Sequence, residues 1–96
     1  MSLEEELEKK VDKYQKLTEK ALNLVKLNEK LNTEQKLIAE DFLSMTRNYL
    51  NDGKYYREKK ELLIALASFS YAHAWLDAGV RAKIFYAKDD QLFTLP

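Results

Sequence analysis

The sequence contains no cysteine, and this absence removes several classes of site at once. Disulfides, thiolate zinc sites, iron-sulfur clusters and cysteine nucleophiles all require that side chain. A chain that cannot form disulfides suits a reducing compartment, so we expect a cytoplasmic protein.

Net charge and long apolar runs are missing as well. Sixteen basic and sixteen acidic residues give a formal net charge of zero, so no overall field draws the chain toward nucleic acid or an anionic membrane. No apolar run approaches the roughly 20 residues that a membrane-spanning helix needs, and the N-terminus is acidic rather than basic and then apolar. We therefore expect a protein that is neither exported nor inserted in a membrane.

Catalytic motifs are also absent. The sequence has no G-x-S-x-G elbow, no phosphate-binding glycine loop and no zinc-protease helix motif. We accordingly expect no catalytic residues, no bound metal and no cofactor. The chain is interpreted as a protein without enzymatic activity.

Helix breakers are rare, because the 96 residues include two glycines and one proline. Between Leu3 and Leu31 apolar residues recur at alternating steps of four and three, interrupted by Lys10 and Asn28, which predicts one long amphipathic helix over residues 3–31. Asn32 or Thr33 then provides an N-cap for a second helix over residues 33–51. The apolar stripe expected on the inner side of this second helix consists of Ile38, Phe42, Met45 and Tyr49, with Leu37, Leu43 and Leu50 alongside.

A helix turn is expected at Asn51, Asp52 and Gly53. Only glycine enters the left-handed conformation at a helix C-terminus without steric cost, so Gly53 is the clearest stop signal in the chain. The residues after it predict a third helix over 55–86 and a polar tail over 87–96 whose apolar end folds back.

These elements predict a single all-α domain over residues 1–96. Its architecture is an antiparallel hairpin of long helices, or a three-helix bundle, with a short C-terminal tail. The third helix would be roughly 45 Å long and the second roughly 28 Å, so the two cannot cover one another completely. The first helix, or another subunit, would have to cover the remainder.

One stretch of the sequence resembles a known family. Residues 49–85 read YLNDGKYYREKKELLIALASFSYAHAWLDAGVRAKIF, and LFT follows at residues 92–94. This stretch is similar to the archaeal short proteins of domain-of-unknown-function family 357, and its most specific part is YAHAWLDAGVR, residues 71–81. The resemblance implies a cytoplasmic, archaeal, helical protein, and it implies no catalytic residues.

A polar set on the third helix is the first candidate site. His73, Asp77 and Arg81 follow one another at four-residue steps and therefore share one helix face. Asp77 would orient His73 as a base and Arg81 would bind an anion, or the three form a hydrogen-bonded structural seam, which we favour. A metal bound by His73 would need carboxylates from other helices, for which the nominal candidates are Glu40, Asp41 and Asp52.

A basic cluster lies just after the expected turn. It contains Lys54, Arg57, Lys59 and Lys60, beside two tyrosines and interrupted by two glutamates. Basic residues next to aromatic ones are typical of contacts with nucleic acid. The alternative function is therefore an accessory RNA- or nucleotide-binding protein.

The leading hypothesis is a protein-protein interaction or self-association module, with a homo-oligomer or another protein as the partner. The candidate interface residues are Tyr71, Trp75, Ala78 and Gly79. Ala78 and Gly79 are small enough to let another helix approach closely, which would explain a glycine inside an otherwise strong helix. The motivating observation is the difference in expected helix length.

Overall fold

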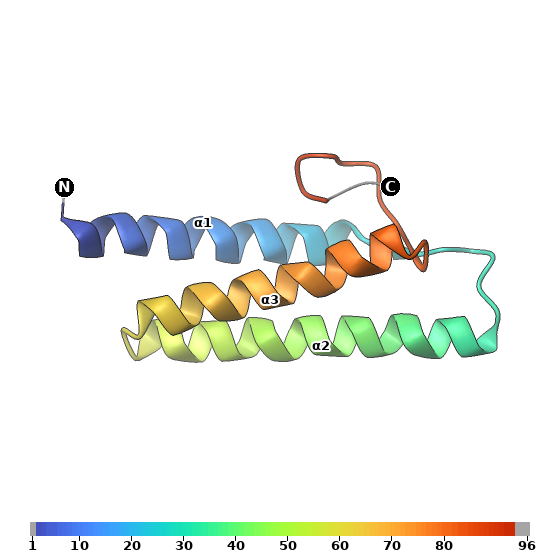
Figure 1. The fold of residues 1–96 in the computed structure, drawn as a ribbon, viewed down its shortest axis with the longest axis horizontal. Helices are drawn as coiled ribbons and strands as arrows, with labels where there is room; N and C mark the ends of the chain where they lie inside the picture. Colours follow the sequence, from blue (N-terminus) through green and yellow to red (C-terminus); the bar gives the residue numbers. More distant parts are fainter. Residues whose placement is uncertain (1, 94–96) are drawn as a thin grey trace.

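Three α-helices make up most of the chain in the computed structural model, which describes residues 2–93 (Figure 1). They are α1 (Leu3–Leu24), α2 (Thr33–Glu58) and α3 (Leu62–Arg81). Helices α1 and α3 run in one direction and α2 runs in the opposite direction, with α3 lying obliquely between the other two in this view. The expected all-α fold, a three-helix bundle, is confirmed.

Side-chain caps fix the beginnings of the first two helices. The Ser2 hydroxyl accepts a hydrogen bond from the Glu5 backbone N–H at 3.2 Å. At α2 the Asn32 side chain accepts from the Gln35 backbone N–H, and the Gln35 side chain accepts from the Asn32 backbone N–H, which is a complete capping box. The N-terminus predicted for the second helix is therefore the one observed.

The prediction of a first helix over residues 3–31 is wrong at its C-terminal end. Helix α1 ends at Leu24, and Val25 already has an extended conformation with ψ 143°. Strand β1 (Lys26–Leu27) then pairs antiparallel with β2 (Phe85–Tyr86), and the Asn28 side chain donates to the Lys83 carbonyl at 2.9 Å. The apolar spacing continues past Leu24. The backbone there nevertheless leaves the helix, because it pairs with the distant strand β2.

The helix turn predicted at Asn51, Asp52 and Gly53 is also wrong, because α2 continues through all three residues to Glu58. Gly53 does not have a positive φ. It is buried, and a Cβ atom added to it would lie 2.4 Å from Cε1 of Phe69. Gly53 is therefore a point of close contact between α2 and α3.

The real connection between α2 and α3 is formed by residues 59–61, where Lys60 has a φ of 63°. The predicted third helix over 55–86 is consequently shorter, with 20 residues, whereas α2 has 26. At 1.5 Å per residue these lengths are about 30 Å and about 39 Å, the reverse of the expected order. The predicted length difference thus no longer argues for a second subunit.

Two clusters of buried side chains hold the bundle together. One lies toward the α2–α3 turn and centres on Phe69, which is fully buried, as is Val11, and packs with the buried Leu50. The other lies toward the β1–β2 pair and includes Leu76, Val80 and Phe85.

The polar segment after β2 returns to the bundle. Leu92 and Phe93 are buried in the second of these clusters, at 5% and 4% exposure. The apolar end of the tail therefore folds back as far as the structure describes it. The remaining tail residues, including Thr94 of the family-like stretch, lie outside the described residues.

No helix within residues 2–93 combines the length and the apolar character that are needed to cross a lipid bilayer.

Candidate protein-interaction surface

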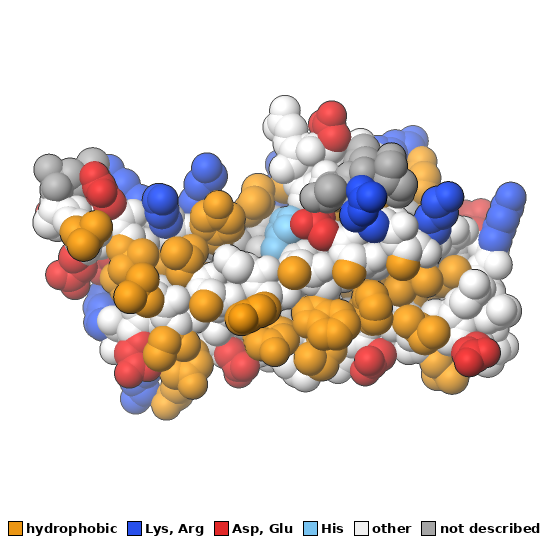
Figure 2. Space-filling view, in the orientation of Figure 1, with side chains coloured by type: hydrophobic (Ala, Val, Ile, Leu, Met, Phe, Trp, Pro, Cys, Tyr) orange, Lys and Arg blue, Asp and Glu red, His pale blue; other side chains and the backbone are white. Residues whose placement is uncertain are grey.

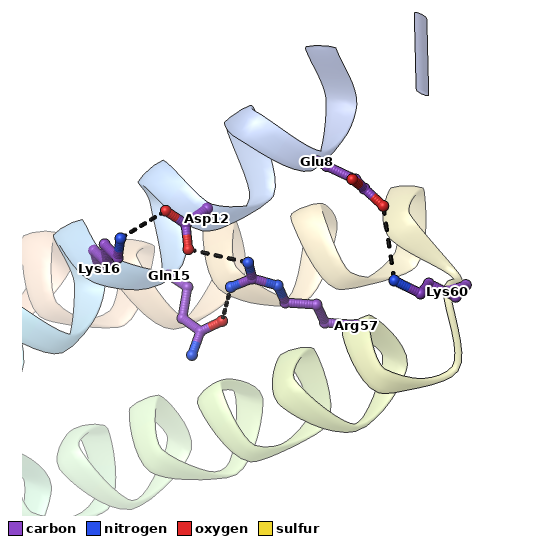
Figure 3. Close-up of polar contacts among 6 residues, drawn as sticks. All are labelled: Glu8, Asp12, Gln15, Lys16, Arg57 and Lys60. Atoms are coloured by element: carbon purple, nitrogen blue, oxygen red, sulfur yellow. Dashed lines mark hydrogen bonds and ion pairs between the residues drawn. The ribbon is translucent and has the colours of Figure 1, made fainter. Parts of the chain in front are cut away.

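The basic cluster after the expected turn lies against α1 (Figure 3). Arg57 donates from Nη1 to Oε1 of Gln15 at 2.6 Å and from Nη2 to Oδ1 of Asp12 at 3.0 Å. Both acceptors are on α1, so the guanidinium links the two helices. Hydrogen bonds from the Lys16 and Arg57 side chains, in that order, lower the pKa of the Asp12 carboxyl below its usual value.

The other cations of this cluster also have partners within the chain. Lys60 lies 3.8 Å from a carboxylate oxygen of Glu8, and Lys54 lies 3.3 Å from one of Glu19. Lys59 lies over the Tyr55 ring at 5.6 Å. The Lys54 and Lys60 side chains remain 46% and 74% exposed, so the geometry favours a structural role in docking α1 chiefly for Arg57.

His73 joins three segments of the fold. Because the Leu92 carbonyl can only accept, His73 Nε2–H donates to it at 2.5 Å, and in the neutral imidazole Nδ1 accepts from the Thr18 hydroxyl at 3.1 Å. Asp77 lies 3.9 Å from Nε2. The imidazole therefore ties α1 and the tail to α3, and sequence reasoning missed Thr18 and Leu92 because no local pattern connects them to residue 73.

The polar set and the nominal metal ligands do not assemble into a metal site. Within residues 2–93 no three His, Asp or Glu side chains are placed to hold an ion. Arg81 is exposed at the C-terminal end of α3, while His73 and Asp77 are partly buried beside the tail.

The outer side of α3 is apolar and uncharged over most of its length. From Leu62 to Leu76 the helix contains no Asp, Glu, Lys or Arg, although six of these fifteen residues are exposed. Ile64 is 47% exposed and Tyr71 is 60% exposed. Exposed alanines extend this strip along α3 at positions Ala67, Ala74 and Ala78.

An apolar edge of α2 borders the same strip. The Phe42 and Trp75 rings meet edge to face with centroids 4.9 Å apart, and the Tyr49 and Tyr71 rings lie 5.5 Å apart. We call the combined surface the α2–α3 face. It consists of Ile38, Phe42, Met45, Tyr49, Ile64, Ala67, Tyr71, Ala74, Trp75 and Ala78.

Figure 2 shows hydrophobic side chains over α3 and along its border with α2, with charged side chains gathered mainly at the edges of the view. The α2 members of this face are the stripe predicted to point inward. The buried line of α2 instead runs one position later, through Ala39, Leu43, Thr46, Leu50 and Gly53. The predicted stripe therefore lies at the border of the core: Phe42 and Tyr49 are half-buried against the buried clusters, whereas Ile38 is 45% exposed.

The proposed role of Gly79 is corrected by its surroundings. Gly79 is buried, and a Cβ atom added to it would lie 2.1 Å from Cδ2 of Phe85. The glycine therefore makes room for the ring of β2 in the same chain. Of the four predicted interface residues, Tyr71 and Ala78 are exposed and Trp75 is half-buried, so these three belong to the α2–α3 face.

Sequence reasoning missed Ile64, Ala67 and Ala74 as members of this face. A signal for them exists, since they alternate with Tyr71 and Ala78 at steps of three and four along the chain. It is obscured because the buried residues of α3 follow the same periodicity.

The family model described as "Protein of unknown function (DUF357)" matches residues 13–85, which is more than half of the chain and includes all three helices in whole or part. Searches of the curated proteins and of the solved structures gave no match.

Proposed function

This chain belongs to the DUF357 family of proteins of unknown function, and we propose that it is a protein-interaction module whose docking surface is the α2–α3 face. The observation that carries the proposal is the combination of exposed Ile64 and Tyr71 with a helix that has no charge from Leu62 to Leu76. Large exposed apolar patches on a folded chain are typical of protein contacts.

The composition of the face supports this proposal. Aromatic residues and methionine are enriched at the centres of protein interfaces, and charged residues are depleted there. The face has aromatic side chains at Phe42, Tyr49, Tyr71 and Trp75, together with Met45. The surface that best matches it is the apolar side of another α-helix, because α3 and the edge of α2 form a long ridge that a helix can pack against.

The RNA-binding alternative has weaker support. Its cations at residues 54, 57 and 60 contact acidic or amide side chains of α1, and the chain carries no net charge. The absence of salt-sensitive RNA binding would remove this alternative. For the interaction module we propose action in the cytoplasm, which the lack of cysteine supports.

The test is native mass spectrometry of the protein purified gently from its own host. We expect the wild-type chain to retain a protein partner or a further copy of itself, and Ala74→Glu to lose it, since a carboxylate in the centre of an apolar interface loses its hydration. The matched control is Asn51→Glu, which changes the charge equally at an exposed position of α2 that lies more than about 100° around the helix from the α2 members of the face.

Both variants should give the helical circular dichroism of the wild type, since glutamate is a good helix former. A wild-type chain that is recovered as a bare monomer would contradict the proposal. Equal loss of the partner in Ala74→Glu and in Asn51→Glu would place the contact elsewhere.

A further inference from the structure

A heptad pattern runs along the exposed side of α3. The residues are spaced by three, four, three and four positions, as at the a and d positions of a coiled coil. The seam, as we call it, consists of Ile64, Ala67, Tyr71, Ala74 and Ala78. This seam is separate from the buried line of α3, which packs on α1 and α2. Such a pattern on an exposed face indicates docking of one further helix.

The seam is almost symmetric about its middle residue. Ile64 and Ala78 each lie seven positions from Tyr71, and Ala67 and Ala74 lie four and three positions from it. Two copies of α3 packed antiparallel about Tyr71 would therefore match Ile64 with Ala78 and Ala67 with Ala74. Three alanines among five seam residues permit an interaxial distance near the lower end of the usual range, about 8 Å.

We infer that the partner is a second copy of this chain, packed α3 against α3 in antiparallel orientation with the twofold axis beside Tyr71. This inference rests on the proposed function of the α2–α3 face. An isologous interface must be complementary to itself, and a face without charges near its centre meets that requirement because no like charges are brought together.

The ends of α3 favour the antiparallel orientation. Arg81 and Glu61 lie ten positions on either side of Tyr71, so each arginine would lie level with the glutamate of the other copy. A parallel pair would place arginine beside arginine and would align the two helix dipoles unfavourably. The antiparallel pair brings opposite charges to both ends of the seam.

The available area is of the order that a stable dimer needs. Helix α3 has 20 residues and is about 30 Å long, and a face two helices wide is about 20 Å across. The projected area is therefore about 600 Å², and protruding rings such as Tyr71 and Trp75 increase the accessible area. Stable interfaces bury about 800 Å² on each partner, which is of the same order.

The absence of native cysteine allows a direct test by disulfide cross-linking. Ala67→Cys and Ala74→Cys chains, one of them tagged, are co-expressed, purified and oxidised. We expect a tagged-untagged product of twice the 11.3 kDa chain mass plus the mass of the tag, because the two positions face one another across the seam. Ala67→Cys alone should not cross-link, since its two copies would be about 12 Å apart along the axis, beyond the roughly 4.4–6.8 Å between the Cα atoms of a disulfide.

Two controls complete the set. Ala78→Cys alone should stay uncross-linked, because its copies would be separated by about 21 Å. Lys13→Cys, on the exposed side of α1, gives the background from random collisions. Sedimentation of the reduced proteins reports the dimer independently of the disulfide.

The outcomes separate this inference from the proposed function. Cross-linking of Ala67→Cys and Ala78→Cys each with itself would indicate a parallel pair and overturn the inference, while the α2–α3 face would stand as a docking surface. A monomer by sedimentation that is recovered from the host with a different protein on this face would overturn the second copy alone. A bare monomer in both experiments would overturn both proposals.

Discussion

Replacing Gly53 by alanine tests the contact that distinguishes the tertiary structure from the local signal of the sequence. A Cβ atom at this position would lie 2.4, 2.6 and 2.8 Å from three ring atoms of Phe69, a side chain that is fully buried. Overpacking of this kind usually costs about 1–3 kcal/mol, whereas alanine in place of a helical glycine gains about 1 kcal/mol. Because the ring is rigid and enclosed, we expect the upper part of the overpacking range.

The net effect of Gly53→Ala is therefore a loss of about 1–2 kcal/mol in the free energy of unfolding. For a chain of this size that corresponds to a fall in Tm of roughly 5–15 °C. Thermal melts followed by circular dichroism would measure it. Protein concentration must be held constant, because association through the α2–α3 face would raise the apparent stability.

Repeating the Gly53→Ala substitution in a Phe69→Leu variant identifies the cause of the lost stability. In Phe69→Leu the ring atoms nearest Gly53 are replaced by a smaller, more mobile side chain, so Gly53→Ala should there be neutral or stabilising by up to about 1 kcal/mol. An equal loss in both backgrounds would mean that the glycine is needed for its backbone conformation, as in the predicted turn. A rise in Tm in the wild-type background would refute the close contact itself.

Two further predictions concern the ion pairs and the face. The lowered pKa of Asp12 means that its contribution to stability is present above its usual pKa and is lost as the pH falls through the lowered value. Thermal melts between about pH 5 and about pH 2 should therefore show a smaller loss of stability in Asp12→Asn than in wild type, and identical pH profiles would contradict this. Trp75 is half-buried against Phe42, so Trp75→Ala should cost about 1–2 kcal/mol and weaken association in sedimentation; a loss of about 3–5 kcal/mol would indicate a core residue.

Part of the fold could be predicted because its causes are local. The capping residues Asn32 and Gln35 are three positions apart, and their hydrogen bonds to the backbone need nothing else from the chain. The beginning of α2 was therefore predicted correctly. The end of α1 was not, because its continuation is decided by pairing with β2, some sixty positions away in the chain.

The two glycines show the same limit. From the sequence, Gly53 was interpreted as a helix stop and Gly79 as a position that lets another helix approach closely. In the structure Gly53 makes room for Phe69 and Gly79 makes room for Phe85. No spacing rule connects these pairs. A residue without a side chain is equally compatible with a turn and with a close contact until its neighbour is known.

For the candidate sites too, the sequence indicated some residues, while their partners depend on how the helices pack. The apolar residues Tyr71, Trp75 and Ala78 were selected from the sequence, and the fold places them on one partly exposed face. The basic cluster was selected from its composition alone. Its partners on α1, including Asp12 and Gln15, lie 35 or more positions earlier in the chain and appear only when the helices pack together.

By itself the sequence determined that this protein is made of helices, because apolar residues recur with a helical period, breakers are few and caps are local. The tertiary structure alone decided where the helices end and which apolar stripe of each faces inward. Periodicity states which residues share a side of a helix, whereas burial depends on the neighbour that covers that side. In this chain α3 has one apolar side against α1 and α2 and a second apolar side toward solvent, and only packing distinguishes the two.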